Sequence, residues 1–326
     1  MARQTFEDWI PEEYGGAVVT KVQQMSAIEA HARREPMTSD VKNVPRSGGM
    51  SFGGAIGKGL AYTEDGATND DVTLTALKFG RAMRVADEDL KDTANVVNII
   101  QTKQLDWARA YAVGFDQACL GTSAAANGTT VPFLSLYQAL NTTNSAVGYT
   151  ADDHVVATSA GVAPTYANLS DVFGKVEESG YWVDGEMLVI AHPSFRAKLR
   201  NITGTLTYYD GVDEATASDG RPVFVEAASQ ALGTPDTLFG VPIAWSLGAK
   251  TNATASDAPS GSPLLFVGNR NFLIKGERSP IEYMLAGADT GAAFLTDEAL
   301  LKVRVRRGFA VANENAWAVL EAVPSA

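Results

Sequence analysis

The sequence is poor in the residue types from which most active sites are built. It contains one cysteine, Cys119, and three histidines, His31, His154 and His192, which are scattered along 326 residues. Protein metal centres need clustered histidine, cysteine or carboxylate ligands, and an intramolecular disulfide needs two cysteines. The composition therefore favours neither a metal site nor a disulfide framework, and the single cysteine is interpreted as a small core residue.

Long apolar runs and an excess of basic charge are also missing. The strongest apolar runs, residues 187–191 and 264–267, are much shorter than the ~20 residues of a membrane-spanning helix. The 26 lysine and arginine residues are outnumbered by 38 aspartate and glutamate residues, which gives a formal net charge of -12. Nucleic-acid ligands are bound by neutralising their phosphates with basic side chains. The charge balance thus argues against a nucleic-acid-binding protein, although it suits a protein that stands beside DNA without binding it.

Signatures of nucleophilic and phosphate-binding sites are absent or incomplete. The chain has no His-Glu-x-x-His helix, and the spacing Gly-x-Ser-x-Gly occurs once, at residues 49–53 (GMSFG), within the glycine-rich stretch that is interpreted below as part of a hairpin arm. Residues 53–59 (GGAIGKG) look superficially like a phosphate-binding loop, which requires a glycine five positions before its Gly-Lys pair and a serine or threonine after it. Phe52 and Gly59 occupy those two positions. A flexible hairpin arm is the favoured interpretation, and a nucleotide-binding enzyme using residues 53–59 is the alternative from another class of function.

The first part of the chain predicts extended segments instead of a compact core. Residues 16–32 carry apolar side chains at helical spacing. Residues 45–84 combine a cluster of six glycines, an acidic turn and alternating apolar residues, so we predict two long strands around a flexible tip. Residues 1–13 are expected to be extended, with apolar anchors at Phe6, Trp9 and Ile10.

A long helix is expected next. Residues 92–120 repeat apolar side chains at helical spacing, and Gly121 follows as the expected C-terminal cap. At ~1.5 Å per residue, such a helix reaches on the order of 40 Å. This is long for a compact domain, and it indicates a spine on which other parts are arranged.

The rest of the chain predicts a compact mixed domain. Helices are expected at residues 134–140 and 169–178, and from His192-Pro193 onward. Residues 204–220 are interpreted as a loop. Strands are expected at residues 186–191, 221–226, 237–247, 264–267, 271–275, 280–285, 300–311 and 317–321.

The strand at residues 300–311 has the sharpest charge pattern in the sequence. Apolar side chains occupy one of its faces, and the opposite face carries Lys302, Arg304 and Arg306. Like charges at alternate positions repel mildly, so an opposite partner would stabilise them. We predict a contact with the acidic hairpin tip of another subunit, and a solvated strand face is the alternative. The acidic tip comprises Glu64, Asp65, Asp70 and Asp71.

Several short motifs follow one another in a set order between residues 87 and 322. They are FDQACLG at residues 115–121, LVIAHP at 188–193, LFGVP at 238–242, LFVGN at 265–269 and the closing strands from residue 294 onward. Together with the preceding hairpin and arm, this order resembles that of the major capsid proteins of tailed bacteriophages, which share the Hong Kong 97 type fold.

The resemblance implies an α+β protein of the Hong Kong 97 type with four parts. These would be an N-terminal arm at residues 1–43, an extended hairpin loop at 44–86, a peripheral domain of spine helix plus sheet at 87–160 and 286–326, and an axial domain at 161–285. The last strand would be able to return to the axial domain.

The resemblance also implies a structural function without catalysis. Such a protein assembles with copies of itself into hexamers and pentamers, which form the icosahedral or prolate head shell around the double-stranded DNA of a tailed phage. No catalytic, cofactor-binding or metal site is expected. An encapsulin-like nanocompartment shell is the alternative within the same fold.

Further partners follow from the same resemblance. A portal and a decoration protein are expected, and the packaged DNA would lie inside without specific binding. Because Met1 lies almost directly before the expected arm, the scaffolding protein would be separate or missing. The expected location is the virion, with the host cytoplasm during assembly, and no membrane is involved.

Overall fold

The computed structural model describes residues 25–49, 52–62, 64, 69–86, 88, 99–209, 214–226, 236–286 and 297–325. The chain divides into two compact units. Unit 1 comprises Met1–Gln23, Phe79–Ala110 and Ile281–Val305, and unit 2 comprises Gln24–Lys78, Tyr111–Pro280 and Arg306–Ala326.

The centre of unit 2 is a seven-stranded mixed sheet with the strand order β5-β15-β12-β6-β11-β10-β9. β6 pairs in parallel with β11 and antiparallel with β12, which pairs antiparallel with β15. All residues of β6 and β12 are buried, as expected for central strands that are covered on both faces. The strands are β5 (Val155–Ala157), β6 (Met187–Ala191), β9 (Phe224–Val225), β10 (Thr237–Leu238), β11 (Val241–Trp245), β12 (Leu264–Asn269) and β15 (Trp317–Glu321).

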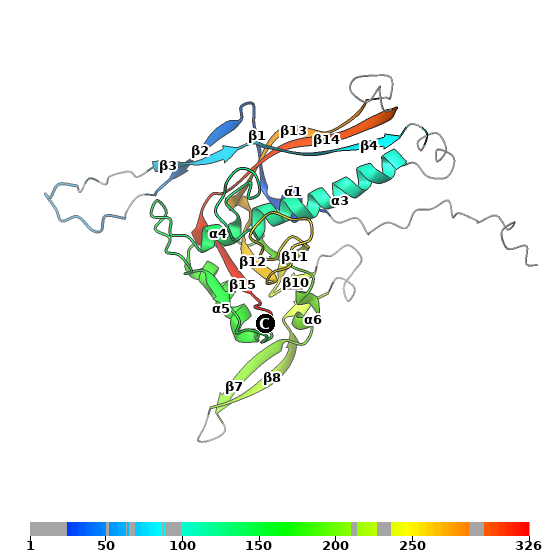
Figure 1. Cartoon of the computed structure of the whole chain (residues 1–326). Coiled ribbons are helices and arrows are strands. Elements are labelled where there is room, and N and C mark those ends of the chain that lie inside the picture. Colours follow the sequence, from blue (N-terminus) through cyan, green and yellow to red (C-terminus); the bar gives the residue numbers. More distant parts are fainter. Residues whose placement is uncertain are drawn as a thin grey trace, which may run out of the picture. The chain divides into compact units, whose positions relative to one another are not determined.

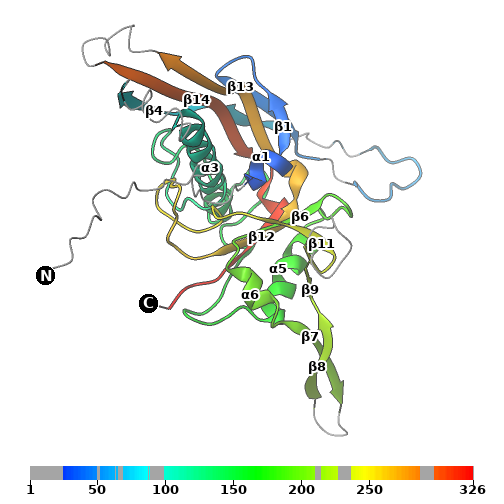
Figure 2. The same cartoon turned by 90° about the vertical axis from the view of Figure 1, so that its right-hand side faces the viewer.

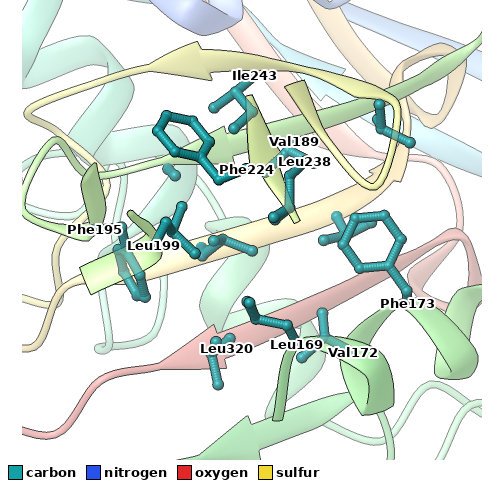
Figure 3. Close-up of a cluster of buried hydrophobic side chains, with 14 of the residues drawn as sticks. Leu169, Val172, Phe173, Val189, Phe195, Leu199, Phe224, Leu238, Ile243 and Leu320 are labelled. Atoms are coloured by element: carbon teal, nitrogen blue, oxygen red, sulfur yellow. The ribbon is translucent and has the colours of Figure 1, made fainter. Parts of the chain in front are cut away.

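Two helices, α5 (Tyr166–Glu178) and α6 (Phe195–Leu199), lie beside this sheet in Figure 2. Both contribute side chains to its core. α5 begins at a capping box formed by Thr165 and Asn168, and Gly180, at φ 77°, follows its end. α6 presents its first and last side chains to the same core. In Figure 3 the core side chains come from both helices and from several strands, including Leu169, Val172, Phe195, Val189 and Leu320.

Two hairpins also belong to unit 2 (Figure 1). β2 (Val41–Ser47) pairs antiparallel with β3 (Asn69–Thr75), and β7 (Thr203–Tyr209) pairs antiparallel with β8 (Glu214–Pro222). The remaining described elements of unit 2 are short, namely α1 (Ala27–His31), β1 (Arg33–Pro36), α4 (Leu136–Leu140) and the single turns Arg270–Phe272 and Glu314–Ala316.

A second sheet has the strand order β1-β13-β14-β4, and three of its strands continue from one unit into the other. These are β4 (Leu77–Ala86), β13 (Leu273–Ala286) and β14 (Glu298–Val311), and α3 (Ile99–Leu120) also continues across the boundary. Within unit 1, Trp107 of α3 meets Tyr283 of β13 edge to face, with ring centroids 6.4 Å apart. Leu301 and Val303 of β14 are buried.

The long helix and the closing strands are confirmed. α3 ends at Leu120 as expected, while residues 92–98 lie outside the described residues. β14 and β15 match the two expected closing strands, and Cys119 is a fully buried core residue. The expected role of Gly121 changes, because it does not adopt a positive φ. A Cβ at this position would lie 2.0 Å from the carbonyl oxygen of Lys250, so glycine is required by a close approach of two backbones.

The predicted hairpin over residues 45–84 is wrong in its second strand. β3 ends at Thr75, and β4 belongs to the other sheet. Between them, the backbone N–H of Ala76 donates to the carbonyl oxygen of Asp40, 2.7 Å away, which closes the β2–β3 hairpin at its base. The apolar alternation changes phase at this point, from Val72, Leu74 and Ala76 to Leu77 and Phe79, and this shift marks the change of sheet.

Two helix starts also differ from the prediction. Within the described residues, the helix expected at 16–32 is limited to α1, because Ser26 caps its N-terminus; residues 16–24 lie outside the described residues. The helix expected to begin at His192-Pro193 begins at Phe195. A turn comes first, in which the N–H of Phe195 donates to the carbonyl oxygen of His192, 3.0 Å away.

Two strand assignments are corrected as well. The expected loop at residues 204–220 is the β7–β8 hairpin, because residues 203–209 (TGTLTYY) are rich in β-branched and aromatic residues that favour strands. The strands expected at 271–275 and 280–285 are parts of the single strand β13. Its polar middle conceals this continuity, although β1 pairs in parallel with it up to Glu277.

The close approach at Gly121 generates a paired prediction. Gly121→Ala should destabilise the chain by ~1–3 kcal/mol or more, because the clashing atom is the backbone carbonyl oxygen of Lys250, which cannot move aside as the end of a flexible side chain can. Gly174→Ala is the control, since this glycine lies inside α5 with no atom within 4 Å of an added Cβ. Alanine should stabilise that helix by up to about 1 kcal/mol. Urea unfolding of both variants checks this, and equal effects would contradict the close approach.

Candidate functional site

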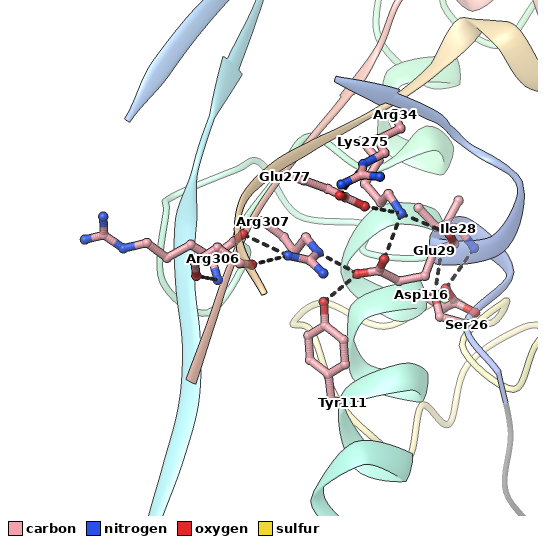
Figure 4. Close-up of polar contacts among 11 residues, drawn as sticks. Ser26, Ile28, Glu29, Arg34, Tyr111, Asp116, Lys275, Glu277, Arg306 and Arg307 are labelled. Atoms are coloured by element: carbon pink, nitrogen blue, oxygen red, sulfur yellow. Dashed lines mark hydrogen bonds and ion pairs between the residues drawn. The ribbon is translucent and has the colours of Figure 1, made fainter. Parts of the chain in front are cut away.

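A cluster of polar side chains in unit 2 surrounds Glu29 of α1 (Figure 4). One carboxylate oxygen of Glu29 accepts from Nε of Arg307 at 2.8 Å and from the hydroxyl of Tyr111 at 2.9 Å. The other oxygen accepts from Nζ of Lys275 at 2.8 Å. Lys275 also donates to the backbone carbonyl of Glu29 and contacts Glu277, each at 2.9 Å. Glu29 therefore ties α1 to α3, β13 and β14.

A second carboxylate, that of Asp116 in α3, holds the start of the same short helix. It is fully enclosed and accepts from the backbone N–H groups of Ala27 and Ile28, at 2.8 and 3.2 Å. The hydroxyl of Ser246 donates to it at 2.6 Å, and the hydroxyl of Ser26 donates to it as well. The carboxylate thus satisfies backbone donors that the first turn of a helix leaves unpaired. We call Ser26, Glu29, Tyr111, Asp116, Ser246, Lys275 and Arg307 the polar centre.

The two carboxyl groups of the polar centre differ in their electrostatics. Burial by itself would raise the pKa of Glu29, but hydrogen bonds and charge from Lys275 and Arg307 outweigh it and lower that pKa. Burial raises the pKa of Asp116, and the hydrogen bonds from Ser246 and Ser26 oppose this rise. Burial and the neighbouring Glu29 raise the pKa of the Tyr111 hydroxyl. Charge on Glu29 is thus stabilised by two fixed cations.

This arrangement positions backbone. Its carboxylates are occupied by donors from neighbouring elements, and the serine hydroxyls that reach Asp116 are buried together with it. Its effect is mechanical: it fixes α1, from which the chain continues into β1 and the β2–β3 hairpin. Among the described residues, no group of three or more histidine, cysteine, aspartate or glutamate side chains could hold a metal ion. In the same described part, no helix is both long and apolar enough to span a membrane.

The acidic tip predicted from the sequence is only partly free of partners within the chain. Asp70 is bound by Arg46 of β2, whose Nε lies 2.7 Å from its carboxylate. Asp71, in β3, and Glu64 are exposed. Asp65 lies outside the described residues. Arg46 lowers the pKa of the Asp70 carboxyl through the hydrogen bonds it donates.

The basic face of β14 has the expected orientation. Lys302 is exposed, and its apolar neighbours Leu301 and Val303 are buried. Arg304 donates to Glu282 of β13 at 2.7 Å, and Arg306 lies 3.4 Å from Asp40. Among the described residues, neither arginine pairs with the acidic tip of its own chain. A contact with another subunit stays a prediction.

Two features of the site were not identified from the sequence. The first is the polar centre, whose residues lie far apart in the chain. One feature of the sequence indicated it: Arg307 lies at the same alternate positions of β14 as the apolar residues Val303 and Val305. The second feature is the strong exposure of apolar side chains in the segment of residues 52–62. Phe52 is 97% exposed and Tyr62 85% exposed, and Leu60 is also exposed.

Comparison with known proteins decides the class of this chain. The model of the phage capsid family matches residues 8–322. The chain belongs to the phage capsid family. No curated protein matches the chain.

Solved structures agree on the fold. A chain from Mycobacterium phage Ogopogo has a TM-score of 0.69 at 16% identity, covering 99% of this chain and 100% of that chain. A chain from Mycobacterium phage Bobi has a TM-score of 0.67 at 16% identity, covering 98% and 97%. The capsid of an empty GTA particle has a TM-score of 0.62 at 16% identity, covering 97% and 96%. The expected α+β fold of the Hong Kong 97 type is confirmed.

These findings also bear on the alternatives. The family is one of structural capsid proteins, which confirms the expected class of function and does not favour an encapsulin-like shell. The phosphate-loop interpretation of residues 53–59 finds no support in the geometry. Within the described residues, this segment follows the exposed strand β2 and leads to β3, whereas a phosphate loop connects a strand to a helix.

The polar centre predicts a specific pH dependence. Because the folded chain lowers the pKa of Glu29, the charged carboxylate stabilises the fold above its ordinary pKa near 4.3, and this stabilisation is lost as the pH falls through the lowered value. Glu29→Gln should cost on the order of 2 kcal/mol at pH 7. This is less than the ~3–5 kcal/mol for a fully buried pair, because 23% of the side chain is exposed. The difference from the unaltered chain should shrink towards pH 3.

Urea unfolding at pH 7, 5 and 3 measures this difference. Glu177→Gln, at an exposed position of α5, is the matched control and should leave stability nearly unchanged. Asp116 is present in all variants, so its opposite pH dependence cancels in the comparison. A cost of Glu29→Gln that stays constant from pH 7 to pH 3 would contradict the account of the polar centre.

Proposed function

We propose that this chain is the major capsid protein of a tailed phage, and that it assembles into hexamers and pentamers which form the head shell around double-stranded DNA. The family match over residues 8–322 supports this assignment, and one structural observation carries the self-assembly. The segment of residues 52–62 displays Phe52, Leu60 and Tyr62 to solvent, while the polar centre fixes α1, which precedes the hairpin that bears it. Large exposed apolar groups of this kind mark surfaces that another protein covers.

The division of the shell protein into parts is also a proposal. We infer an N-terminal arm at residues 1–43, an extended hairpin loop at 44–86, a peripheral domain at 87–160 and 286–326, and an axial domain at 161–285. Within the loop region, β2 and β3 form the hairpin, and Leu77–Ala86 form β4 of the four-stranded sheet. The pairing of β15 with β12 supports the return of the last strand to the axial part.

The proposal includes a location and partners. The chain would reside in the virion and pass through the host cytoplasm during assembly, with a portal, a separate scaffolding protein and a decoration protein as partners. Its net charge of -12 suits a wall that encloses DNA without binding it specifically.

The charged residues contribute unequally to the proposed contact between subunits. Arg304, Arg306 and Asp70 have partners in their own chain, so a contact with another subunit would have to replace existing ion pairs. Lys302 is exposed, and Glu64 and Asp71 are exposed on the acidic side. We therefore propose that Lys302 and these two carboxylates make the larger contribution to any electrostatic contact between subunits.

Electron microscopy of the purified, full-length protein tests the proposed function. Closed shells with hexameric and pentameric units are expected, formed by the protein alone or after a scaffolding protein is supplied. Small soluble oligomers under both conditions would contradict the proposal.

The exposed apolar segment yields a prediction that separates folding from assembly. Phe52→Ser combined with Tyr62→Ser should leave the circular dichroism spectrum and melting temperature unchanged, because both side chains are exposed in the subunit. Shell formation should fall by about tenfold or more, since covering each large apolar side chain contributes ~1.5–3 kcal/mol. Sedimentation of assembled material is the measurement. Met25→Ser alters an exposed apolar residue outside the segment and is the control; normal shell yield from the double variant would contradict the role of the segment.

A charge reversal tests the basic face. Lys302→Glu should leave the fold unchanged and weaken assembly by only a few-fold, because an exposed ion pair contributes ~0–1 kcal/mol. Salt near 1 M should reduce the difference between variant and unaltered chain, since the Debye length then falls to about 3 Å. Assembly that is unaffected by Lys302→Glu at low salt would remove this residue from the interface.

A further inference from the structure

A groove with a mixed lining lies within unit 1. It has a volume of about 390 Å³, within the range of ligand-binding clefts. Trp107 of α3, Met83 of β4, and Leu301 and Val303 of β14 supply an apolar floor. The shell proposed above does not use this groove.

The rim of the groove is basic. Arg81 of β4 and Lys103 of α3 both line it, and among the described lining residues the one carboxylate is Asp106. Lys103 and Arg109 each approach Asp106 to 3.6 Å, so this one negative charge is shared between two positive ones. Lys103 and Asp106 are both roughly half exposed, and the rim is open to a partner from solvent. The groove thus favours an occupant that combines large apolar side chains with acidic ones.

The chain itself contains such a segment outside the described residues. Residues 6–14 read FEDWIPEEY, with aromatic and aliphatic side chains at Phe6, Trp9, Ile10 and Tyr14. The acidic residues of this segment are Glu7, Asp8, Glu12 and Glu13, and the segment has no basic residue. Its charge and its apolar content are complementary to those of the groove.

We propose that the groove of unit 1 is the docking site of residues 6–14, with Trp9 and Ile10 on its apolar floor and the flanking carboxylates at Arg81 and Lys103. The helical wall from Lys103 to Ala110 is ~10 Å long at ~1.5 Å per residue. Three extended residues span about the same length at ~3.3 Å each. Trp9, Ile10 and one neighbouring residue therefore span the groove, and the acidic residues on either side of them reach the rim.

The exposed segment of residues 52–62 is the competing occupant. It also offers large apolar side chains, but its one charged residue is Lys58. A positive charge would be repelled by Arg81 and Lys103, whereas four carboxylates would be attracted. The charges therefore favour residues 6–14 as the occupant of the groove.

Photo-crosslinking of the full-length protein tests the docking directly. Benzoylphenylalanine replaces Trp9 in one variant and Leu60 in a second, and the products are mapped by mass spectrometry. The expected result is crosslinking of position 9 to residues 81–83 and 103–110. Crosslinking of position 9 only to other parts of the chain, or of position 60 to the groove in its place, would overturn the proposal.

A charge exchange provides the second, independent test. Lys103→Glu should reduce the yield of the crosslink from position 9 by about fivefold, the factor that corresponds to about 1 kcal/mol. Adding Glu12→Lys and Glu13→Lys should restore it. Arg84→Glu is the matched control, because Arg84 lies on the same strand as Arg81 but pairs with Glu298 and does not line the groove. Equal losses from Lys103→Glu and Arg84→Glu, or no rescue, would contradict the charge recognition.

Mixing isotopically heavy and light chains identifies the source of the docked segment. If crosslinked pairs combine one heavy and one light peptide, the docked segment comes from a neighbouring chain. If both peptides of every pair carry the same label, it comes from the same chain. The groove binds the segment in both cases. Shell formation is scored separately by electron microscopy. Failure of the docking and failure of the proposed function are therefore distinguished.

Discussion

The enclosure of two carboxylates at the start of α1 is the constraint on which the rest of unit 2 depends. Asp116 accepts the first backbone donors of this helix, and Glu29 is held by Lys275, Arg307 and Tyr111. Buried ion pairs add little net stability compared with apolar packing, but losing one partner is costly. The polar centre is therefore best understood as a device that fixes position. It sets where α1 lies, and β1 and the hairpin that displays residues 52–62 follow directly along the chain.

The same constraint explains why the core sheet and the β2–β3 hairpin have different roles. The seven-stranded sheet, with fully buried β6 and β12, supplies a conventional core. The hairpin of β2 and β3 and the segment at its tip contribute little to that core, and Phe52 and Tyr62 face solvent. A subunit with a rigid base and uncovered apolar extensions is suited to burying them in neighbours. This arrangement agrees with the membership of the chain in the phage capsid family.

The sequence was sufficient for the order of parts and insufficient for the contacts between them. The spine helix and the closing strand at residues 300–311 were predicted because a period of 3.6 or 2 extends over enough residues, and the buried strand at residues 187–191 because it is a short continuous apolar run. The β7–β8 hairpin was missed because glycine and polar residues outweighed its strand-forming threonines and tyrosines. The polar centre was missed because Glu29 and Lys275 are 246 positions apart, and no local pattern links them. Arg307 was the exception, since its apolar-facing position contradicts its charge.

Hydrogen exchange on isolated subunits and on assembled particles tests the central claim most directly. The account predicts that the amides of residues 27–36, which the polar centre and β13 hold, are protected to the same extent in both states. It predicts that residues 52–62 exchange rapidly in the subunit and become protected only after assembly. Equal exchange of residues 52–62 in the two states, or protection of residues 27–36 that appears only in the particle, would contradict it.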